Sequence, residues 1–406
     1  MTTITGALAK PGGNLDRFLA WLGLTLWLVF NVVVLFLAWR DPGARSVIGN
    51  YRDASAGWWA GTDIYGTSID GFLYLPSFAV LYTPFFLLGP HVGDTLWRIV
   101  SAGLLSWAIW RAVRLYLPAR HFMAFAQSLP LVLVVGSAAL RNGQATTLLV
   151  ALMLLGTIAI VEQRWWRAAA FLTLAFAIKP LGIVLVLLAA ALYRPLRVAL
   201  AIGVALVILL PLIHPDPPAA WHVYGLGFNK LIASSLPGRQ TWSDITGLMD
   251  KIGLSLPEAA WTVIRALTAL LTLWVGYLAV RRQAPAIAAL DLFALAVCYL
   301  MLMNPRTEEN TYIMFAVALA LFTTILRWGE ISQFRAWLLV GFAVLLGCHN
   351  YGSWIFRPTE YWLKPLVCIA FLPILLEASL GRLFYRGDLS EEAAASSTTA
   401  GSSPRP

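Results

Sequence analysis

Asp53 is the carboxylate whose sequence context is best suited to chemistry. It follows Arg52 and opens the segment 53–60, DASAGWWA. The adjacent residues Trp58 and Trp59 are typical of a short helix that lies in the membrane–water interface. A carboxylate held at that depth can take the proton of a hydroxyl group as a general base. Asp is also a preferred N-cap residue, and the pattern alone favours a cap over a base.

Two isolated cations lie in apolar surroundings. Lys179 precedes Pro180 within an apolar stretch, and Arg306 belongs to the segment 304–310, NPRTEEN, between two late apolar stretches. An unpaired charge at membrane depth is costly, so it marks a functional site by default. Arg306 at such a place can hold a lipid phosphate. For Lys179 the alternative is snorkelling to the interface, if its helix breaks at Pro180.

Further polar residues lie near the ends of apolar stretches. Arg141 and Gln144 form a second polar cluster with the same two interpretations as Lys179. A structural role is favoured for the remaining residues, as helix first-turn residues, turn residues or loop residues at the membrane: Glu308, Glu309, Asp63, Asp70, His214 and His222.

The composition decides the class of protein. The chain has 406 residues, of which 59% are hydrophobic and 12% charged, and its mean hydropathy is +0.74. So few polar side chains cannot cover a water-facing surface of this size, which excludes a soluble enzyme. The apolar stretches are continuous rather than alternating, so the sequence predicts an all-α polytopic membrane bundle. The net charge of +9 then indicates basic cytoplasmic loops rather than a nucleic-acid partner.

The sequence carries no sign of a metal site or a cofactor. Cys298, Cys348 and Cys368 fall in apolar stretches without a CxxC pair, and the five His residues form no HxxxH or HExxH motif. A Walker loop, a dinucleotide fingerprint and an Asp-x-Asp clamp are missing as well. We therefore expect neither a metal nor a cofactor.

About twelve transmembrane helices are expected in a single domain, residues 1–385, followed by a disordered cytoplasmic tail, residues 386–406. Two long polar loops, residues 40–71 and 214–258, interrupt the helices. The expected spans are 18–39, 72–90, 96–117, 122–140, 143–161, 165–193, 195–213, 259–280, 286–303, 308–327, 335–349 and 361–384.

Loop charges predict the orientation. Arginine pairs near residues 194–197, 281–282, 327–335 and 382–386 place both termini in the cytoplasm and both long loops outside. Simple alternation then leaves five arginines on the wrong side, namely Arg111, Arg114, Arg120, Arg164 and Arg167. They return to the cytoplasm if the stretches 72–90 and 165–193 are broken, half-crossing hairpins, which Pro76, Pro84 and Pro180 permit. Both versions remain open.

Several short motifs occur in a characteristic order. They are Asp53…Trp59-Ala-Gly61-Thr-Asp63-Ile-Tyr65, Phe72-Leu-Tyr74-Leu-Pro76…Pro84, Gly143-Gln144, Lys179-Pro180 and Asn304-Pro305-Arg306. Together they resemble the polyprenol-phosphate-mannose-dependent mannosyltransferases of the glycosyltransferase C superfamily, which include the mycobacterial phosphatidylinositol-mannoside mannosyltransferases. Each motif is short, and the resemblance covers about residues 50–310. One departure is Leu75, where the family commonly has a second Pro.

The resemblance implies a hexosyltransferase of the plasma membrane. Because both long polar loops lie on one face, its active site is expected on the extracytoplasmic face. Transfer is expected to invert the anomeric centre by a single displacement and to need no metal, because cationic groups can stabilise the leaving lipid phosphate. Its partners would be a polyprenyl-phosphate-linked sugar donor, with mannose expected, a glycolipid or polysaccharide acceptor, and membrane lipids. Asp53 becomes the expected catalytic base. The expected substrate-binding residues are Lys179, Arg306, Arg141, Gln144, His222, Tyr65 and Glu308. A transporter or flippase of lipid-linked sugars is the alternative, although the chain shows no paired internal repeat.

Overall fold

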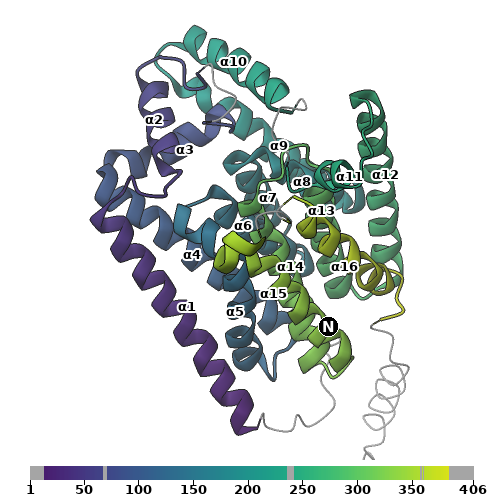
Figure 1. Ribbon diagram of the computed structural model, residues 1–406. Coiled ribbons are helices and arrows are strands. Elements are labelled where there is room, and N and C mark those ends of the chain that lie inside the picture. The colour runs from purple at the N-terminus through teal and green to yellow at the C-terminus, as the bar shows by residue number, and fades with distance from the viewer. Residues whose placement is uncertain (1–12, 67–70, 236–241, 357–358, 360, 384–406) are drawn as a thin grey trace, which may run out of the picture.

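The protein is a bundle of helices, with no strand among the residues that the computed structural model describes: 13–66, 71–235, 242–356, 359 and 361–383 (Figure 1). The tail 386–406 and Asp70 lie outside these residues. The helices of the first half are α1 (Asn14–Arg40), α2 (Ile48–Trp59), α3 (Pro76–Leu87), α4 (Gly89–Tyr116), α5 (His121–Asn142), α6 (Ala145–Val161), α7 (Trp165–Ile178) and α8 (Ile183–Leu192). Those of the second half are α9 (Arg197–Leu209), α10 (Pro217–Ser235), α11 (Ile245–Lys251), α12 (Glu258–Arg282), α13 (Pro285–Met303), α14 (Ile313–Trp328), α15 (Gln333–Phe356) and α16 (Leu363–Ser379). Short 3-10 turns are η1 (Pro180–Gly182), η2 (Arg194–Leu196), η3 (Leu210–Ile213) and η4 (Glu309–Tyr312).

Six helical segments among the described residues are long and apolar enough to cross a membrane, so the expected count of twelve spans is not confirmed by length and composition alone. The six are Asn14–Arg40, His121–Asn142, Arg194–Ile213, Glu258–Arg282, Pro285–Met303 and Glu309–Trp328. Several of them, such as α1, α9 and α12, expose rows of large apolar side chains. Such surfaces are typical of helices that face lipid, and the chain is a helical membrane protein.

The expected spans 72–90 and 165–193 do not form single crossing helices. The first is mainly α3, whose 12 residues extend only about 18 Å. The second breaks at Lys179, where the backbone is extended before Pro180, so α7 and α8 are separate helices of 14 and 10 residues. The residue before a proline disfavours the helical conformation, which explains the break. Both stretches are thus interrupted near the prolines Pro76 and Pro180, which is the feature that the broken-hairpin version of the topology requires.

One end of the bundle gathers the arginine-rich connections. Ion pairs join Arg111 to Glu162, Arg120 to Glu330 at 3.0 Å, Arg327 to Asp16 at 2.8 Å, and Arg335 to Glu377 at 2.7 Å. These contacts bring the start of α1 together with the connections after α4, α6 and α14 and with the end of α16. The five arginines that did not fit simple alternation belong to this end. It is called the arginine end below.

The opposite end carries helices that lie beside the bundle rather than within it. There α2, α3 and α10 are grouped together (Figure 1). The short helix in the first loop begins at Ile48, five residues before the expected start at Asp53. The second long loop is largely helical, because α10 and α11 occupy most of it. The residues of α10 that face the protein recur at helical spacing, namely Ala220, Val223, Gly227 and Lys230.

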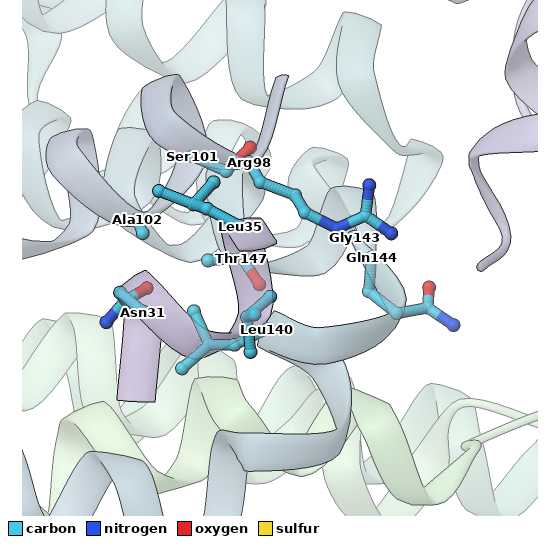
Figure 2. A pocket seen from close by; sticks show the side chains of 10 residues that line it. Asn31, Leu35, Arg98, Ser101, Ala102, Leu140, Gly143, Gln144 and Thr147 are labelled. Carbon is cyan, nitrogen blue, oxygen red and sulfur yellow. The ribbon is translucent and has the colours of Figure 1, made fainter. Parts of the chain in front are cut away.

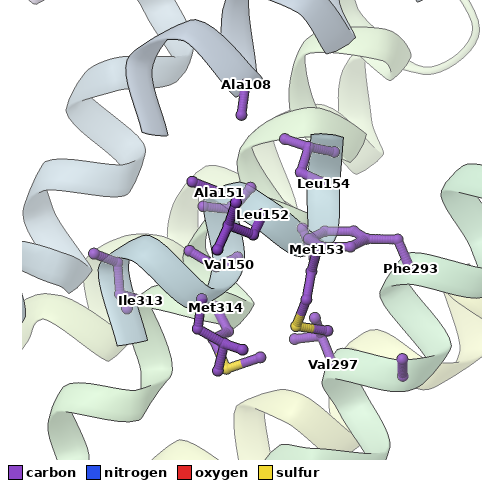
Figure 3. Packing of buried hydrophobic residues seen from close by; sticks show 14 of the residues in the cluster. Ala108, Val150, Ala151, Leu152, Met153, Leu154, Phe293, Val297, Ile313 and Met314 are labelled. Carbon is purple, nitrogen blue, oxygen red and sulfur yellow. The ribbon is translucent and has the colours of Figure 1, made fainter. Parts of the chain in front are cut away.

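The core lies around α6 and α14, which are buried over almost their whole length. Met153 of α6 packs near Phe293 and Val297 of α13, while Met314 of α14 lies below Val150 (Figure 3). Flexible Met side chains suit the irregular gaps between crossing helices. This buried pair of helices forms the rigid support for the connections at both of its ends.

Candidate functional site

A polar cavity of about 240 Å³ lies where six segments distant in sequence meet. Its walls come from α2, the segment before α3, the α5–α6 junction, the break after α7, α10 and the connection between α13 and η4. The lining residues are Val47, Asn50, Tyr51, Gly71, Leu73, Tyr74, Gln144, Lys179, Pro180, Leu181, Leu231, Ser234, Asn304, Arg306 and Glu308. Pockets for drug-sized ligands span roughly 300–1,000 Å³, so this one suits a compact polar group rather than a whole lipid.

Lys179 enters the cavity from the break between α7 and η1. Its Nζ donates to Oγ1 of Thr146 at 3.1 Å and lies 5.9 Å from the centre of the Tyr74 ring. Among the described residues, no carboxylate lies within 4.0 Å of this amine. The helix break thus presents a half-buried ammonium group whose closest partners are neutral.

Arg306 is the second cation of the cavity. Its guanidinium lies 4.6 Å from the centre of the Trp242 ring, a distance that favours a cation–π contact. Its Nε atom is 3.9 Å from Oε1 of Glu308, which is the one carboxylate among the cavity-lining residues of the described chain. The two cations and one carboxylate leave the lining with a net charge of +1.

The α5–α6 junction supplies the third positive element. Gly143 ends α5 with φ of +65°, and Gln144 is the N-cap of α6. The N-terminus of a helix carries a partial positive charge and attracts anions. Because Lys179 bonds to Thr146 in the first turn of α6, the ammonium group and this helix terminus lie together.

A second, very small cavity of about 10 Å³ lies behind the same junction. Figure 2 shows Arg98 reaching toward Gly143 from α4, while the Gln144 side chain points away from Asn31 and Ser101. Gln144 lines both cavities, so it separates this space from the polar cavity.

Two buried tyrosines close the wall beside Lys179. The hydroxyls of Tyr51 and Tyr74 are 3.0 Å apart, and the backbone N–H of Ala145 donates to the Tyr51 hydroxyl at 3.1 Å. Burial raises the pKa of Tyr51 to about 12, so this hydroxyl stays protonated near neutral pH. The Tyr65 hydroxyl donates to the backbone carbonyl of Tyr74 at 2.9 Å. The tyrosines thereby fix α2 against the start of α6.

The structure gathers four of the eight expected site residues in this cavity: Gln144, Lys179, Arg306 and Glu308. Tyr65 is buried behind Tyr74 and supports the wall rather than lining the cavity. Arg141 is exposed in the last turn of α5, and His222 is exposed on α10. Neither of these two lines the cavity.

Asp53 is exposed in the middle of α2 and is not an N-cap, because the helix begins at Ile48 after Val47. The cap interpretation is therefore wrong. Asp53 does not line the cavity, but Asn50 does, and the two residues are one helical turn apart. Residues three apart on a helix have neighbouring side chains, about 5–6 Å between Cβ atoms, so Asp53 is a neighbour of a lining residue without lining the cavity itself.

Sequence reasoning missed two charged residues next to the site. Asp94 accepts from Arg52 at 2.9 Å and from the Tyr82 hydroxyl at 3.4 Å, and Arg98 follows one turn later in α4. Both side chains are buried. An Asp and an Arg four residues apart at the start of an apolar stretch are a signal for a buried polar site. Asn50 gave no such signal, and Asn304 was noticed only as part of the Asn304-Pro305-Arg306 motif.

The site combines an anion-binding corner with hydroxyl and amide groups. Lys179, Arg306 and the start of α6 can hold a phosphate, whereas Gln144, Asn50 and Asn304 can bind the hydroxyl groups of a sugar. In the described part of the chain, no group of three or more His, Cys, Asp or Glu side chains is placed to hold a metal ion.

Comparison with known proteins gives one match. The model of glycosyltransferase family 87 matches residues 72–305, which is more than half of the chain. The matched range includes Gln144 and Lys179 and ends just before Arg306, and it begins after Asp53. No curated protein and no solved structure matches the sequence.

Proposed function

Because the chain belongs to glycosyltransferase family 87, we propose that it transfers one sugar from a polyprenyl-phosphate carrier to a glycolipid or polysaccharide acceptor. The family identifies a membrane-embedded glycosyltransferase. The observation that carries the choice of donor is the convergence of Lys179, Arg306 and the N-terminus of α6 on one small cavity. Mannose is the proposed sugar, on the resemblance of the sequence motifs alone.

The cavity suits the head of such a donor. A sugar phosphate is compact and anionic, and a volume of about 240 Å³ leaves the prenyl chain outside. Charge-assisted hydrogen bonds from an ammonium and a guanidinium are the strong contacts for a phosphate. Leu73, Leu181 and Leu231 form an apolar part of the lining, next to which the first prenyl units would leave.

The proposed reaction is a single displacement with inversion at the anomeric carbon. The acceptor oxygen forms the new bond to that carbon, while the bond from the carbon to the phosphate oxygen breaks. The phosphate leaves with the electron pair as polyprenyl phosphate, and the proton of the acceptor hydroxyl goes to a carboxylate. Lys179, Arg306 and the dipole of α6 stabilise the charge that develops on the leaving phosphate.

Asp53 is the proposed base. In an inverting displacement the acceptor and its base stand on the face of the sugar opposite to the leaving phosphate. Glu308 lies 3.9 Å from Arg306 and thus beside the proposed phosphate position, which suits a contact with the sugar or a balancing of charge. Asp53 lies on a different element, one turn from the lining residue Asn50.

The proposed orientation places the cavity on the extracytoplasmic face of the plasma membrane. The arginine end is the cytoplasmic end under the positive-inside rule, and the cavity lies with α2 and α10 toward the other end. If α2, α3, α10 and α11 are left out, twelve helices remain, the short α7 and α8 among them, and in this proposal each of them passes once between the two ends. Twelve passages remain our proposal for the topology.

Variants of the two cations test the donor site. Each charge-assisted hydrogen bond is worth about 1.5–3 kcal/mol, so Lys179→Met and Arg306→Met should each raise the donor KM about tenfold or more. The acceptor KM should change little. Lys251→Met, which alters an exposed lysine at the end of α11, is the matched control. Parental donor KM in both cavity variants would place the phosphate site elsewhere.

A further inference from the structure

We propose that Arg98 is a positioning residue that holds the donor-phosphate site in place from behind. This inference rests on the proposed function. Arg98 lies in α4, and its side chain is only 5% exposed. A buried guanidinium is costly to place unless its donors are used, so its hydrogen bonds indicate what it is there to hold.

The guanidinium of Arg98 bonds almost entirely to the backbone of its neighbours. Nε and Nη2 donate to the carbonyl of Arg141 at 3.4 and 3.3 Å, and Nη1 donates to the carbonyl of Asp94 at 3.3 Å. Nη2 also donates to Oγ of Ser46 at 3.1 Å. Among the described residues no carboxylate oxygen lies within 4.0 Å of this group, because the Asp94 carboxylate pairs with Arg52. The direct hydrogen bonds of Arg98 are therefore to neutral groups of the fold, and its attraction to the Asp94 carboxylate acts at a longer distance.

That place is the end of α5, immediately before the α5–α6 junction. The last carbonyls of a helix carry a partial negative charge, so a buried cation is favourable there. Two further bonds fix the same few residues. Trp97 Nε1 donates to the carbonyl of Gly143 at 2.9 Å, and the N–H of Val47 donates to the carbonyl of Asn142 at 3.1 Å. The junction is thus held from α4 and from the start of α2.

The packing leaves no room for a side chain at Gly143, in the middle of the junction. A Cβ on Gly143 would lie 2.3 Å from Cδ1 of Ile48 and 3.4 Å from Cζ of Arg98. Gln144 follows directly, with its side chain pointing away from the small cavity that Arg98 lines (Figure 2). The position of Gln144 and of the first turn of α6, where Thr146 binds Lys179, therefore depends on Arg98.

Replacing Arg98 with Lys distinguishes a positioning role of Arg98 from a purely electrostatic role. Lys keeps the positive charge but cannot donate to three acceptors at once in a fixed plane. Under this proposal Arg98→Lys still folds and weakens the donor site, since a misplacement of about 1 Å costs up to about a hundredfold. An electrostatic role would instead be largely preserved by Lys.

The test measures two quantities on purified full-length protein in lipid nanodiscs. The first is equilibrium binding of undecaprenyl phosphate, and the second is the KM for donor and for acceptor. Arg98→Lys should weaken binding of the probe and raise the donor KM at least tenfold, while the acceptor KM stays within about twofold of the parent. Arg111→Lys, in the same helix at the arginine end, should leave all three values unchanged.

The results that overturn the proposal are distinct from failure of the proposed function. If the parent binds the probe and Arg98→Lys binds it equally well, Arg98 does not position the site. Equal losses for donor and acceptor indicate a merely structural role and also overturn it. Should Arg98→Lys fail to fold, Ser46→Ala carries the test, because it removes one acceptor of Arg98 and should still raise the donor KM severalfold. A parent protein that binds no probe at all contradicts the donor class itself.

Discussion

Lys179 and Thr146 are joined by a hydrogen bond of 3.1 Å, from the amine that ends α7 to a hydroxyl in the first turn of α6. The bond joins the break after α7 to the N-terminus of α6. The ammonium group of Lys179 and the N-terminal end of the α6 dipole, both positive, therefore lie side by side. A neutral partner holds the amine in position without neutralising its charge. The positive charge at this place therefore favours the binding of an anion.

Asp53→Asn is expected to fold and to bind the donor but to lose transfer. Asn and Asp have similar helix propensities, and Asp53 is exposed in mid-helix, so stability should change little. Loss of a general base costs about 10²–10⁴-fold in rate, measured as kcat for sugar transfer.

Glu308→Gln is the matched comparison for Asp53→Asn. It should raise the donor KM while kcat falls less than tenfold, since Glu308 lies beside Arg306 in the cavity lining. If the Asp53→Asn variant is active and the Glu308→Gln variant has no transfer activity, Glu308 rather than Asp53 is the base.

Gly143→Ala should destabilise the protein strongly. The left-handed conformation at φ of +65° costs an L-residue about 1–2 kcal/mol, and the 2.3 Å contact with Ile48 adds an overpacking cost of about 1–3 kcal/mol. Gly253→Ala is the control, because Gly253 has φ of +76° but no atom within 4 Å of its Cβ position. Thermal unfolding in detergent should show a clearly larger loss for Gly143→Ala, and equal losses would contradict the packing argument.

Asp244 gives a pH dependence of stability. It lies in the second loop, and burial raises the pKa of its carboxyl above the usual value. The folded state thus keeps a proton that the unfolded chain has already lost, so its stability falls as pH rises from about 4 toward the folded pKa. Asp244→Asn retains the cap on the N–H groups of Thr246 and Gly247 but cannot ionise.

The unfolding temperature measured against pH tests this. The parent should lose stability relative to Asp244→Asn as the pH is raised from about 4 to 7. Parallel curves of unfolding temperature against pH for the two proteins would show that ionisation of the buried Asp244 carboxyl does not affect stability.

The orientation is tested by cysteine labelling in intact cells. Asp216→Cys lies at the cavity end, just before α10, and Arg164→Cys lies at the arginine end. An impermeant maleimide should label position 216 and reach position 164 only after the cells are permeabilised. Labelling of position 164 in intact cells would contradict this orientation. Residue 164 would then lie outside the cell, either because the stretches 72–90 and 165–193 cross fully or because the whole protein has the opposite orientation.

Part of the lining of the candidate site was predictable, because isolated polar residues in apolar stretches are costly. That argument selected Lys179, Gln144 and Arg306, and the structure brings these three together from distant parts of the chain. The break at Lys179-Pro180 was predictable from the proline. The twelve spans were harder to count, because short helices such as α3 and α8 have the same apolar composition as full crossings.

Other features depend on contacts that a single sequence does not encode locally. Asp53 suggested a cap because its neighbours are helix formers, yet α2 starts earlier, where the N–H of Val47 bonds to the carbonyl of Asn142. The sequence predicts residues 214–258 only as a long polar loop. This loop forms α10, whose Lys230 donates to the carbonyl of Tyr65 at 2.9 Å. Tertiary partners decide both cases.

The most direct test of the account is to ask which donor the protein uses. Purified protein in nanodiscs is supplied with a glycolipid acceptor and with the same radiolabelled sugar, linked either to polyprenyl phosphate or to a nucleoside diphosphate. The account predicts that label moves to the acceptor from the polyprenyl-phosphate donor only, and that Lys179→Met lowers this transfer at limiting donor. Transfer from the nucleotide-linked sugar, with none from the polyprenyl-phosphate sugar, would contradict it.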